Sequence, residues 1–110
     1  MRAALSPRDK ALLQEVKRRV VSIEPNAHVL LYGSVARGTA TPDSDYDVLV
    51  LTPHKLSTAE EDEIYRAIYE LELSGDTVVS TMFYSVEEWN SPVVKASPYH
   101  KNVVRESVAL

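Results

Sequence analysis

The sequence predicts a small α/β (α+β) protein, in which helices pack against a small mixed β-sheet. Segments with a helical spacing of apolar residues alternate with short apolar runs that are typical of strands. The run from Tyr46 to Leu51 is apolar at nearly every position, which predicts an inner strand covered on both faces. A length of 110 residues fits one domain, so residues 1–110 are expected to form a single domain with one modest core.

The helices are predicted from capping residues and apolar periodicity. The first begins after Ser6, since serine can cap a helix and Pro7 suits the first helical position. The long middle helix begins at Ser57 or Thr58, because a glutamate follows each of them three residues later, and it ends at Gly75. The expected helices span residues 7–24, 58–75, 85–89 and 98–106, with one further helical turn after residue 34.

Short runs of apolar, β-branched and aromatic residues predict the strands. They span residues 28–32, 46–51, 77–84 and 108–110, the last of them at an edge of the sheet. The segment between the first two strands, residues 33–44, is rich in Gly, Thr, Pro, Asp and Ser and is expected to be a loop.

Composition argues against several classes of protein. The formal net charge of −4 disfavours binding of nucleic acid, because that binding depends on Lys and Arg displacing counterions from phosphates. No segment has the length of a transmembrane helix, and the first residues do not resemble a signal peptide, so no membrane association is expected. The absence of cysteine excludes disulfides and thiolate ligands and suits a cytoplasmic protein.

Gly33-Ser34 directly follows the first strand and forms the first part of a candidate site. Glycine allows the backbone to approach a ligand closely, and serine adds a hydroxyl. Amides at the start of a helical turn favour anions such as phosphate. The loop that follows brings Arg37, which can bind a phosphate through two hydrogen bonds, and either Asp43 or Ser44 as a cap.

Asp45-x-Asp47, at the start of the second strand, forms the other part. Side chains alternate along a strand, so the two carboxylates face the same way. Their mutual repulsion lowers stability unless a cation bridges them. Mg²⁺ prefers one or two carboxylates together with phosphate oxygens and water, so Asp45 and Asp47 are candidate Mg²⁺ ligands.

The combination of these parts resembles the signature of the DNA polymerase beta-like nucleotidyltransferases. The motif is the run Gly33-Ser-Val-Ala-Arg-Gly38 followed, after a short loop, by Ser44-Asp-Tyr-Asp47. The chain is most similar to the short form, the minimal nucleotidyltransferase. This resemblance implies that Gly33, Ser34, Arg37 and Ser44 bind a nucleoside triphosphate, ATP being the expected one, and that the catalytic residues Asp45 and Asp47 hold Mg²⁺.

The chain departs from the family pattern in its third strand. The family carries a further carboxylate there, and aligning the strand places Ser80 at that position. A hydroxyl is a weak metal ligand and cannot accept the proton of the acceptor as a carboxylate does. Asp76 has the same strand parity but is expected to be a turn residue after Gly75. Nucleotide binding is therefore better supported than nucleotide transfer.

Three hypotheses follow for function. The resemblance implies a nucleotidyltransferase whose acceptor lies on another protein, such as a small helical HEPN-type toxin that an antitoxin modifies with AMP. Alternatively, the chain is an inactive antitoxin that neutralises its partner by contact, or a self-associating domain that senses a nucleotide. A partner or a homo-oligomer is expected to cover an apolar patch formed by Trp89, Val93, Val94 and Tyr99.

Overall fold

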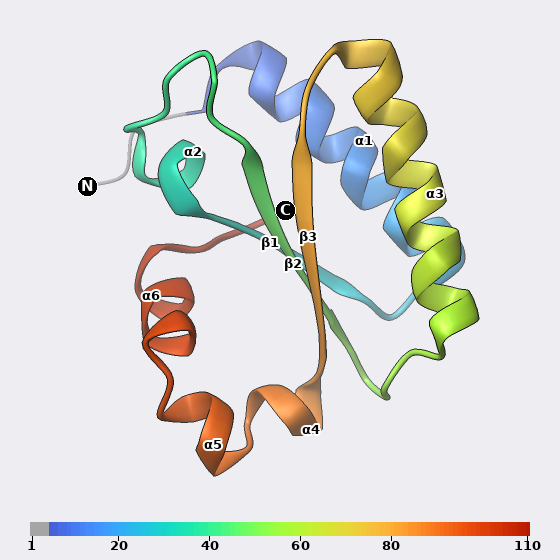
Figure 1. The fold of residues 1–110 in the computed structure, drawn as a ribbon, viewed down its shortest axis with the longest axis vertical. Helices are drawn as coiled ribbons and strands as arrows, with labels where there is room; N and C mark the ends of the chain where they lie inside the picture. Colours follow the sequence, from blue (N-terminus) through green and yellow to red (C-terminus); the bar gives the residue numbers. More distant parts are fainter. Residues whose placement is uncertain (1–4) are drawn as a thin grey trace.

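The computed structural model describes residues 5–110, and in it a four-stranded sheet has helices on both faces (Figure 1). The predicted fold class is confirmed. The elements, in chain order, are α1 (Pro7–Ile23), β1 (His28–Tyr32), α2 (Gly33–Arg37), β2 (Tyr46–Thr52), α3 (Thr58–Gly75), β3 (Val79–Ser85), α4 (Val86–Trp89), α5 (Pro92–Lys95), α6 (Pro98–Glu106) and β4 (Val108–Ala109).

The sheet is mixed, and its strands lie in the order β3-β2-β1-β4. Strand β1 runs antiparallel to β2, with Tyr32 opposite Asp47, and antiparallel to β4, with Leu31 opposite Val108. Strands β2 and β3 are parallel, and α3 makes the crossover between them. Strand β2 therefore lies inside the sheet, as its apolar sequence predicted.

Serine caps begin the two long helices. The Ser6 hydroxyl accepts a hydrogen bond from the Asp9 N–H at 3.0 Å, and Pro7 follows at the first helical position of α1. Helix α3 begins with a full capping box, in which Ser57 and Glu60 each accept a hydrogen bond from the other's backbone N–H. Of the two caps that the sequence allowed for α3, Ser57 is the one used.

Helices on the two faces of the sheet bury alternate side chains of β2. Helices α1 and α3 lie on one side of the sheet, whereas α4, α5 and α6 lie on the other (Figure 1). Val48 and Val50 are fully buried in the core on the α1 and α3 side. Leu49, equally buried, belongs to a second cluster with Trp89 and Val103. Strand β2 is thus the element that both layers share.

The structure corrects three predictions. Strand β3 begins at Val79 rather than residue 77, because Asp76 caps α3 in the left-handed conformation and the Thr77 N–H still bonds to the Glu72 carbonyl. The short helix α5, which Ser91 caps, was not predicted. The expected apolar patch is wrong in its main member, since Trp89 is only 8% exposed.

The other members of that patch also differ in burial. Val93 is 83% exposed, whereas Val94 and Tyr99 are partly buried against Leu49 and Trp89. The reason is that α4 and α6 fold their aromatic side chains onto β2 instead of leaving them for a partner.

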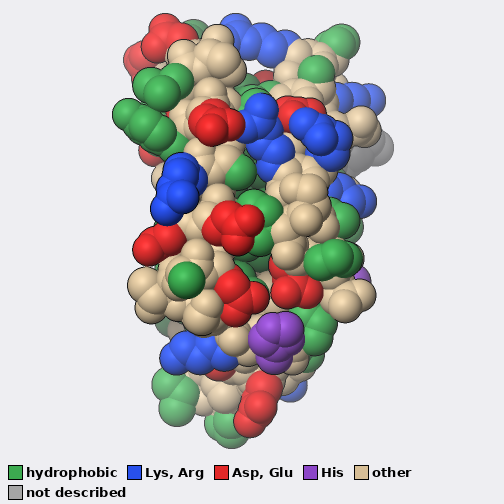
Figure 2. All heavy atoms as spheres, turned by 90° about the vertical axis from the view of Figure 1, so that its right-hand side faces the viewer, with side chains coloured by type: hydrophobic (Ala, Val, Ile, Leu, Met, Phe, Trp, Pro, Cys, Tyr) green, Lys and Arg blue, Asp and Glu red, His purple; other side chains and the backbone are tan. Residues whose placement is uncertain are grey.

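The outer surface over α1 and α3 carries basic and acidic side chains side by side (Figure 2). Arg19 accounts for part of this mixture, since it pairs with Glu15 on α1 and with Glu70 on α3, each at 3.1 Å. Among the described residues, no helix is long and apolar enough to cross a membrane. The cytoplasmic location stays a prediction.

Replacement of Leu49 by Ala tests whether β2 links the two layers. The substitution leaves a cavity between β2 and the α4–α6 layer, so we expect the free energy of unfolding to fall by about 2–5 kcal/mol. Urea denaturation measures this. Val93→Ala, at a site that is 83% exposed, serves as the control and should change stability little. Equal losses for both variants would contradict the assigned packing.

Candidate nucleotide and metal site

The turn from β1 into α2 requires glycine at position 33. Gly33 has φ of +79°, a backbone conformation that residues other than glycine rarely adopt. A Cβ atom added there would lie 2.2 Å from Asp47 Oδ2. The backbone at Gly33 and the carboxylate of Asp47 are therefore in close contact, which is possible because Tyr32 and Asp47 are paired in the sheet.

Asp47 is the second residue of β2 and Asp45 directly precedes the strand, where the sequence predicted the pair. Partial burial raises the pKa of the Asp47 carboxyl above its usual value of 3.8, and the negative charge of Asp45 raises it further. Glu106 adds to this effect, whereas Arg37 opposes it. A cation between the two aspartates would relieve this repulsion, so the donor set fits a hard divalent ion such as Mg²⁺.

Glu106 is a site residue that the sequence analysis missed. One of its carboxylate oxygens accepts a hydrogen bond from the Gly33 N–H at 3.2 Å, and the other accepts one from the Arg37 guanidinium at 3.0 Å. The cause is the pairing of β4 with β1, because continuing the register of Leu31 opposite Val108 by two residues brings Glu106 opposite Gly33. No local pattern could have indicated this contact.

Of the remaining predicted residues, Ser34 lies in α2 and Ser44 on the loop between α2 and β2. The Ser34 carbonyl accepts a hydrogen bond from the Thr39 N–H at 3.0 Å, which helps to close the end of α2. Ser44 does not cap a helix. Its hydroxyl accepts a hydrogen bond from the Thr41 N–H at 2.9 Å and so stabilises the loop ahead of Asp45.

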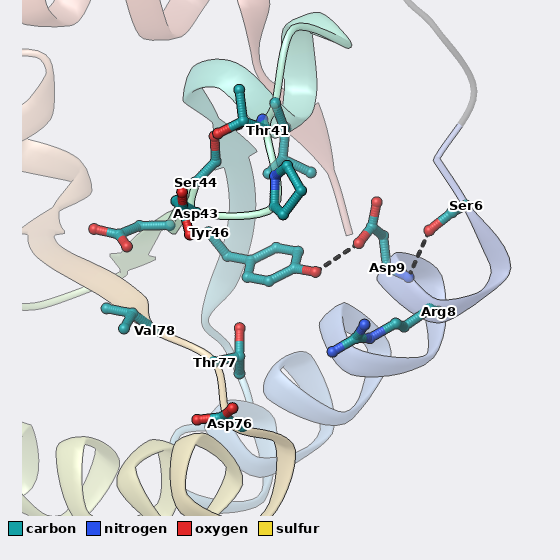
Figure 3. A pocket seen from close by; sticks show the side chains of 14 residues that line it. Ser6, Arg8, Asp9, Thr41, Asp43, Ser44, Tyr46, Asp76, Thr77 and Val78 are labelled. Carbon is teal, nitrogen blue, oxygen red and sulfur yellow. Dashed lines mark hydrogen bonds between the residues drawn. The ribbon is translucent and has the colours of Figure 1, made fainter.

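A cavity of about 660 Å³ lies beside this loop, between the start of α1 and the turn from α3 to β3 (Figure 3). Ser44 and Asp45 are among its lining residues, but Gly33, Arg37 and Asp47 are not. Across this cavity the Tyr46 hydroxyl donates a hydrogen bond of 2.6 Å to Asp9, as the dashed line in Figure 3 shows. The bond ties β2 to α1.

That hydrogen bond also affects the acidity of Tyr46. Burial, together with the hydrogen bond to Asp9 and its negative charge, raises the pKa of Tyr46 to about 12. Tyr46 therefore stays neutral in the physiological range and acts as a donor that anchors the loop.

Ser80 lies directly beside Asp47, since the two are paired across the parallel strands β2 and β3. Residues paired in this way point to the same face of a sheet, so the Ser80 hydroxyl lies on the same face as the Asp47 carboxylate. Asp76 is the left-handed C-cap of α3, with φ of +48°, and lies outside β3. The prediction that Asp76 is a turn residue is confirmed.

A second group of possible metal ligands lies at the other end of β2. Ligand atoms of Glu24, His54 and Glu60 lie within 4.8 Å of one another. His54 follows the end of β2, whereas Asp47 lies near its start, which separates the two groups by roughly 17 Å of strand. Across residues 5–110, no third His, Cys, Asp or Glu ligand completes such a group with Asp45 and Asp47.

A family model described as a nucleotidyltransferase domain matches residues 12–108. The chain belongs to the nucleotidyltransferase domain family. The matched segment includes the Gly33 turn, Asp45, Asp47 and Glu106, so the candidate phosphate and metal residues lie in this nucleotidyltransferase domain. The predicted resemblance to the family is confirmed.

Two solved structures share the fold of this nucleotidyltransferase domain. One is a toxin–antitoxin with AMP-PNP, at a TM-score of 0.59 and 20% identity over 87% of this chain and 69% of that one. The other is a mutant of the toxin–antitoxin MntA-HpeT, at a TM-score of 0.55 and 17% identity over 91% of this chain and 69% of that one. At these identities the likeness concerns the fold. Among curated proteins, no sequence matches significantly.

Gly33→Ala tests the contact between the Gly33 backbone and Asp47. The new Cβ must displace the carboxylate and hold a strained φ, so we expect a loss of about 1–3 kcal/mol in the free energy of unfolding. Gly75→Ala is the matched control, because a Cβ there would meet only Thr77 Cγ2 at an ordinary 3.6 Å. Chemical denaturation of both variants gives the comparison, and equal stability of the two would contradict the contact.

Asp47→Asn tests the repulsion between the carboxylates. Because the folded-state pKa of Asp47 is raised, its ionised form lowers stability as pH rises through that pKa. We therefore expect Asp47→Asn to be more stable than wild type at pH 7, by less than about 1 kcal/mol since the carboxyl is partly solvated, and the difference to vanish towards pH 4.

Denaturation across this pH range, with and without Mg²⁺, measures the effect. Mg²⁺ should stabilise wild type but not Asp47→Asn. Asp43→Asn, on the exposed loop, carries the same charge change and should behave as wild type. A wild-type advantage at pH 7 without metal would contradict the repulsion.

Proposed function

We propose that this nucleotidyltransferase domain binds ATP with Mg²⁺ and transfers AMP to a hydroxyl group on a partner protein. The observation that carries the proposal is the Asp47 carboxylate, which is packed against the Gly33 backbone and repelled by Asp45. An amide donor for phosphate thus lies beside a carboxylate pair suited to a cation. Gly33, Ser34, Arg37 and Ser44 would bind the nucleotide, and Asp45 and Asp47 would hold the metal.

The proposed reaction is an in-line displacement at the α-phosphorus. The acceptor oxygen forms a bond to that phosphorus, the bond to the bridging oxygen of the β-phosphate breaks, and pyrophosphate leaves while the hydroxyl proton passes to water or a carboxylate. Mg²⁺, when bound, supplies positive charge that stabilises the phosphates and the leaving group. Gly33 and Arg37 would orient the outer phosphates through their N–H groups.

The two structural neighbours support ATP as the nucleotide and a toxin as the partner, because both are toxin–antitoxins. One of those toxin–antitoxins is described with AMP-PNP. The other is described as a mutant with two aspartates, two residues apart in its sequence, replaced by glutamate, which is the spacing of Asp45 and Asp47 here. We infer that this chain is the antitoxin of such a pair and that a small helical HEPN-type toxin carries the acceptor hydroxyl.

The alternative is an antitoxin that binds nucleotide but transfers it poorly or not at all. Ser80 favours this reading, because it places a neutral hydroxyl beside Asp47 and leaves the site without a third strand-borne carboxylate. The two readings share the binding step and differ only in turnover.

Incubation with ATP, Mg²⁺ and the cognate toxin distinguishes the two readings. If the two aspartates suffice, the intact mass of the toxin should rise by one or more AMP units, and Asp47→Asn should abolish the shift. No shift with wild type, together with Mg²⁺-dependent ATP binding by calorimetry, would support the binding-only reading. Absence of ATP binding to wild type and to Asp47→Asn alike would refute the nucleotide function.

Ser80→Asp provides the complementary test. The substitution adds a carboxylate beside Asp47, and general-base assistance is typically worth about 10²–10⁴-fold in rate, so transfer should rise by an amount within that range. The metal-free protein should lose stability through added repulsion and regain it with Mg²⁺. Met82→Asp, at an exposed position of the same strand, is the control, because it leaves the acid pair unchanged. Thr81→Asp would not serve, because Thr81 is buried.

A further inference from the structure

Glu106 already accepts hydrogen bonds from the two donors, Gly33 and Arg37, that the proposed function assigns to phosphate. The Glu106 side chain is only 11% exposed, and its two oxygens bridge the Gly33 N–H and the Arg37 guanidinium. A carboxylate and a phosphate both present negatively charged oxygens to such donors. Glu106 therefore satisfies the donors of the site from within the chain.

The bridging carboxylate and a bound phosphate compete for the same hydrogen atom. A backbone N–H has a single hydrogen, so Gly33 cannot make a full-strength hydrogen bond to Glu106 and to a phosphate at once. Arg37 has five N–H donors and its side chain is 48% exposed, so it can exchange one anionic partner for another. Binding of phosphate at Gly33 thus requires that Glu106 give up its hydrogen bond.

The charges act in the same direction as this competition. Asp45, Asp47 and Glu106 are all acidic, and the charges of Asp45 and Glu106 both act on Asp47, whereas Arg37 is the cation paired with Glu106. A polyphosphate entering beside Glu106 meets its negative charge at short range, which is costly even where a metal neutralises the aspartates. Moving the Glu106 carboxylate away removes the competition and the repulsion together.

The fold allows this movement without disrupting the sheet. Glu106 is the last residue of α6, and the backbone on both sides of it is held, by Val103 in the core and by Val108 paired with Leu31. Its side chain alone needs to rotate for the Gly33 N–H to become free. The device is therefore a side-chain gate on a fixed backbone.

We propose that Glu106 gates the nucleotide site: its carboxylate holds the place of a phosphate group, and a nucleoside triphosphate binds by displacing it from Gly33 and Arg37. This inference rests on the proposed function, because it assigns the displacing ligand to that site. It makes Glu106 a determinant of affinity for the polyphosphate part of the ligand and not for the base.

Binding measurements on Glu106→Gln and Glu106→Ala test the gate. Calorimetry with ATP and Mg²⁺ should show tighter binding than in wild type, by about tenfold, which corresponds to the loss of one charge-assisted competitor. Inorganic tripolyphosphate with Mg²⁺ should show the same gain, whereas adenosine should show none. Glu63→Gln, an exposed residue of α3, carries the same charge change and should leave all three affinities unchanged.

The outcomes separate the gate from the proposed function. If ATP binds wild type and both Glu106 variants equally, or binds the variants more weakly, the gate is refuted and Glu106 instead positions Arg37, while the nucleotide function stands. If tripolyphosphate binding tightens in the variants but no AMP is transferred from ATP to the toxin, the gate stands and the transfer function fails. If neither ligand binds wild type or variant, both proposals are overturned. Thermal unfolding of each variant establishes that it is folded.

Discussion

The close contact between the Gly33 backbone and the Asp47 carboxylate constrains the whole site. It depends on a positive φ at Gly33, on the pairing of Tyr32 with Asp47 and on the turn that starts α2 immediately after β1. Shifting the register of β1 and β2 by one residue would turn Asp47 towards the opposite face of the sheet. The arrangement of glycine, helix and carboxylate is therefore set by strand pairing as much as by the residues themselves.

That contact brings like charges together, and the fold offsets the cost elsewhere. Asp47 is partly buried next to Asp45 and Glu106, with Arg37 as the opposing charge, an arrangement that lowers the stability of the protein without a cation. The apolar interior of β2, with Val48, Leu49 and Val50 fully buried between two helical layers, supplies the stability that tolerates it. Strained and repelling groups of this kind are common at functional sites.

The site also draws on parts of the chain that are far apart in sequence. Ser80 reaches Asp47 because α3 returns the chain to form β3 parallel to β2. Glu106 reaches Gly33 because the short strand β4 pairs with β1 and brings back the end of α6. A two-residue strand at the edge of the sheet thereby determines whether the donors of Gly33 and Arg37 face solvent or a carboxylate.

Local patterns in the sequence determined most of the secondary structure and the choice of candidate residues. The serine caps of α1, α3 and α4, the apolar run of β2 and the aspartate spacing depend on interactions within a few residues, which a linear pattern records. The start of β3 and the short helix α5 were missed although their caps, Asp76 and Ser91, are local, whereas the burial of Trp89 was missed because distant contacts decide it. Trp89 is buried because α4 folds back onto Leu49.

Only the tertiary structure decided which charges meet at the site. Asp45 and Asp47 lie two residues apart in the chain, so their repulsion was predictable, but the partner of Arg37 was not. Glu106 lies 69 residues from Arg37, and its position depends on the register between β4 and β1. Hydrogen-bonded register is set by packing of the whole sheet, which no short stretch of sequence specifies. The sequence therefore determined which residues can donate hydrogen bonds and which are acidic. The pairing of β4 with β1 decided that the Glu106 carboxylate accepts hydrogen bonds from Gly33 and Arg37.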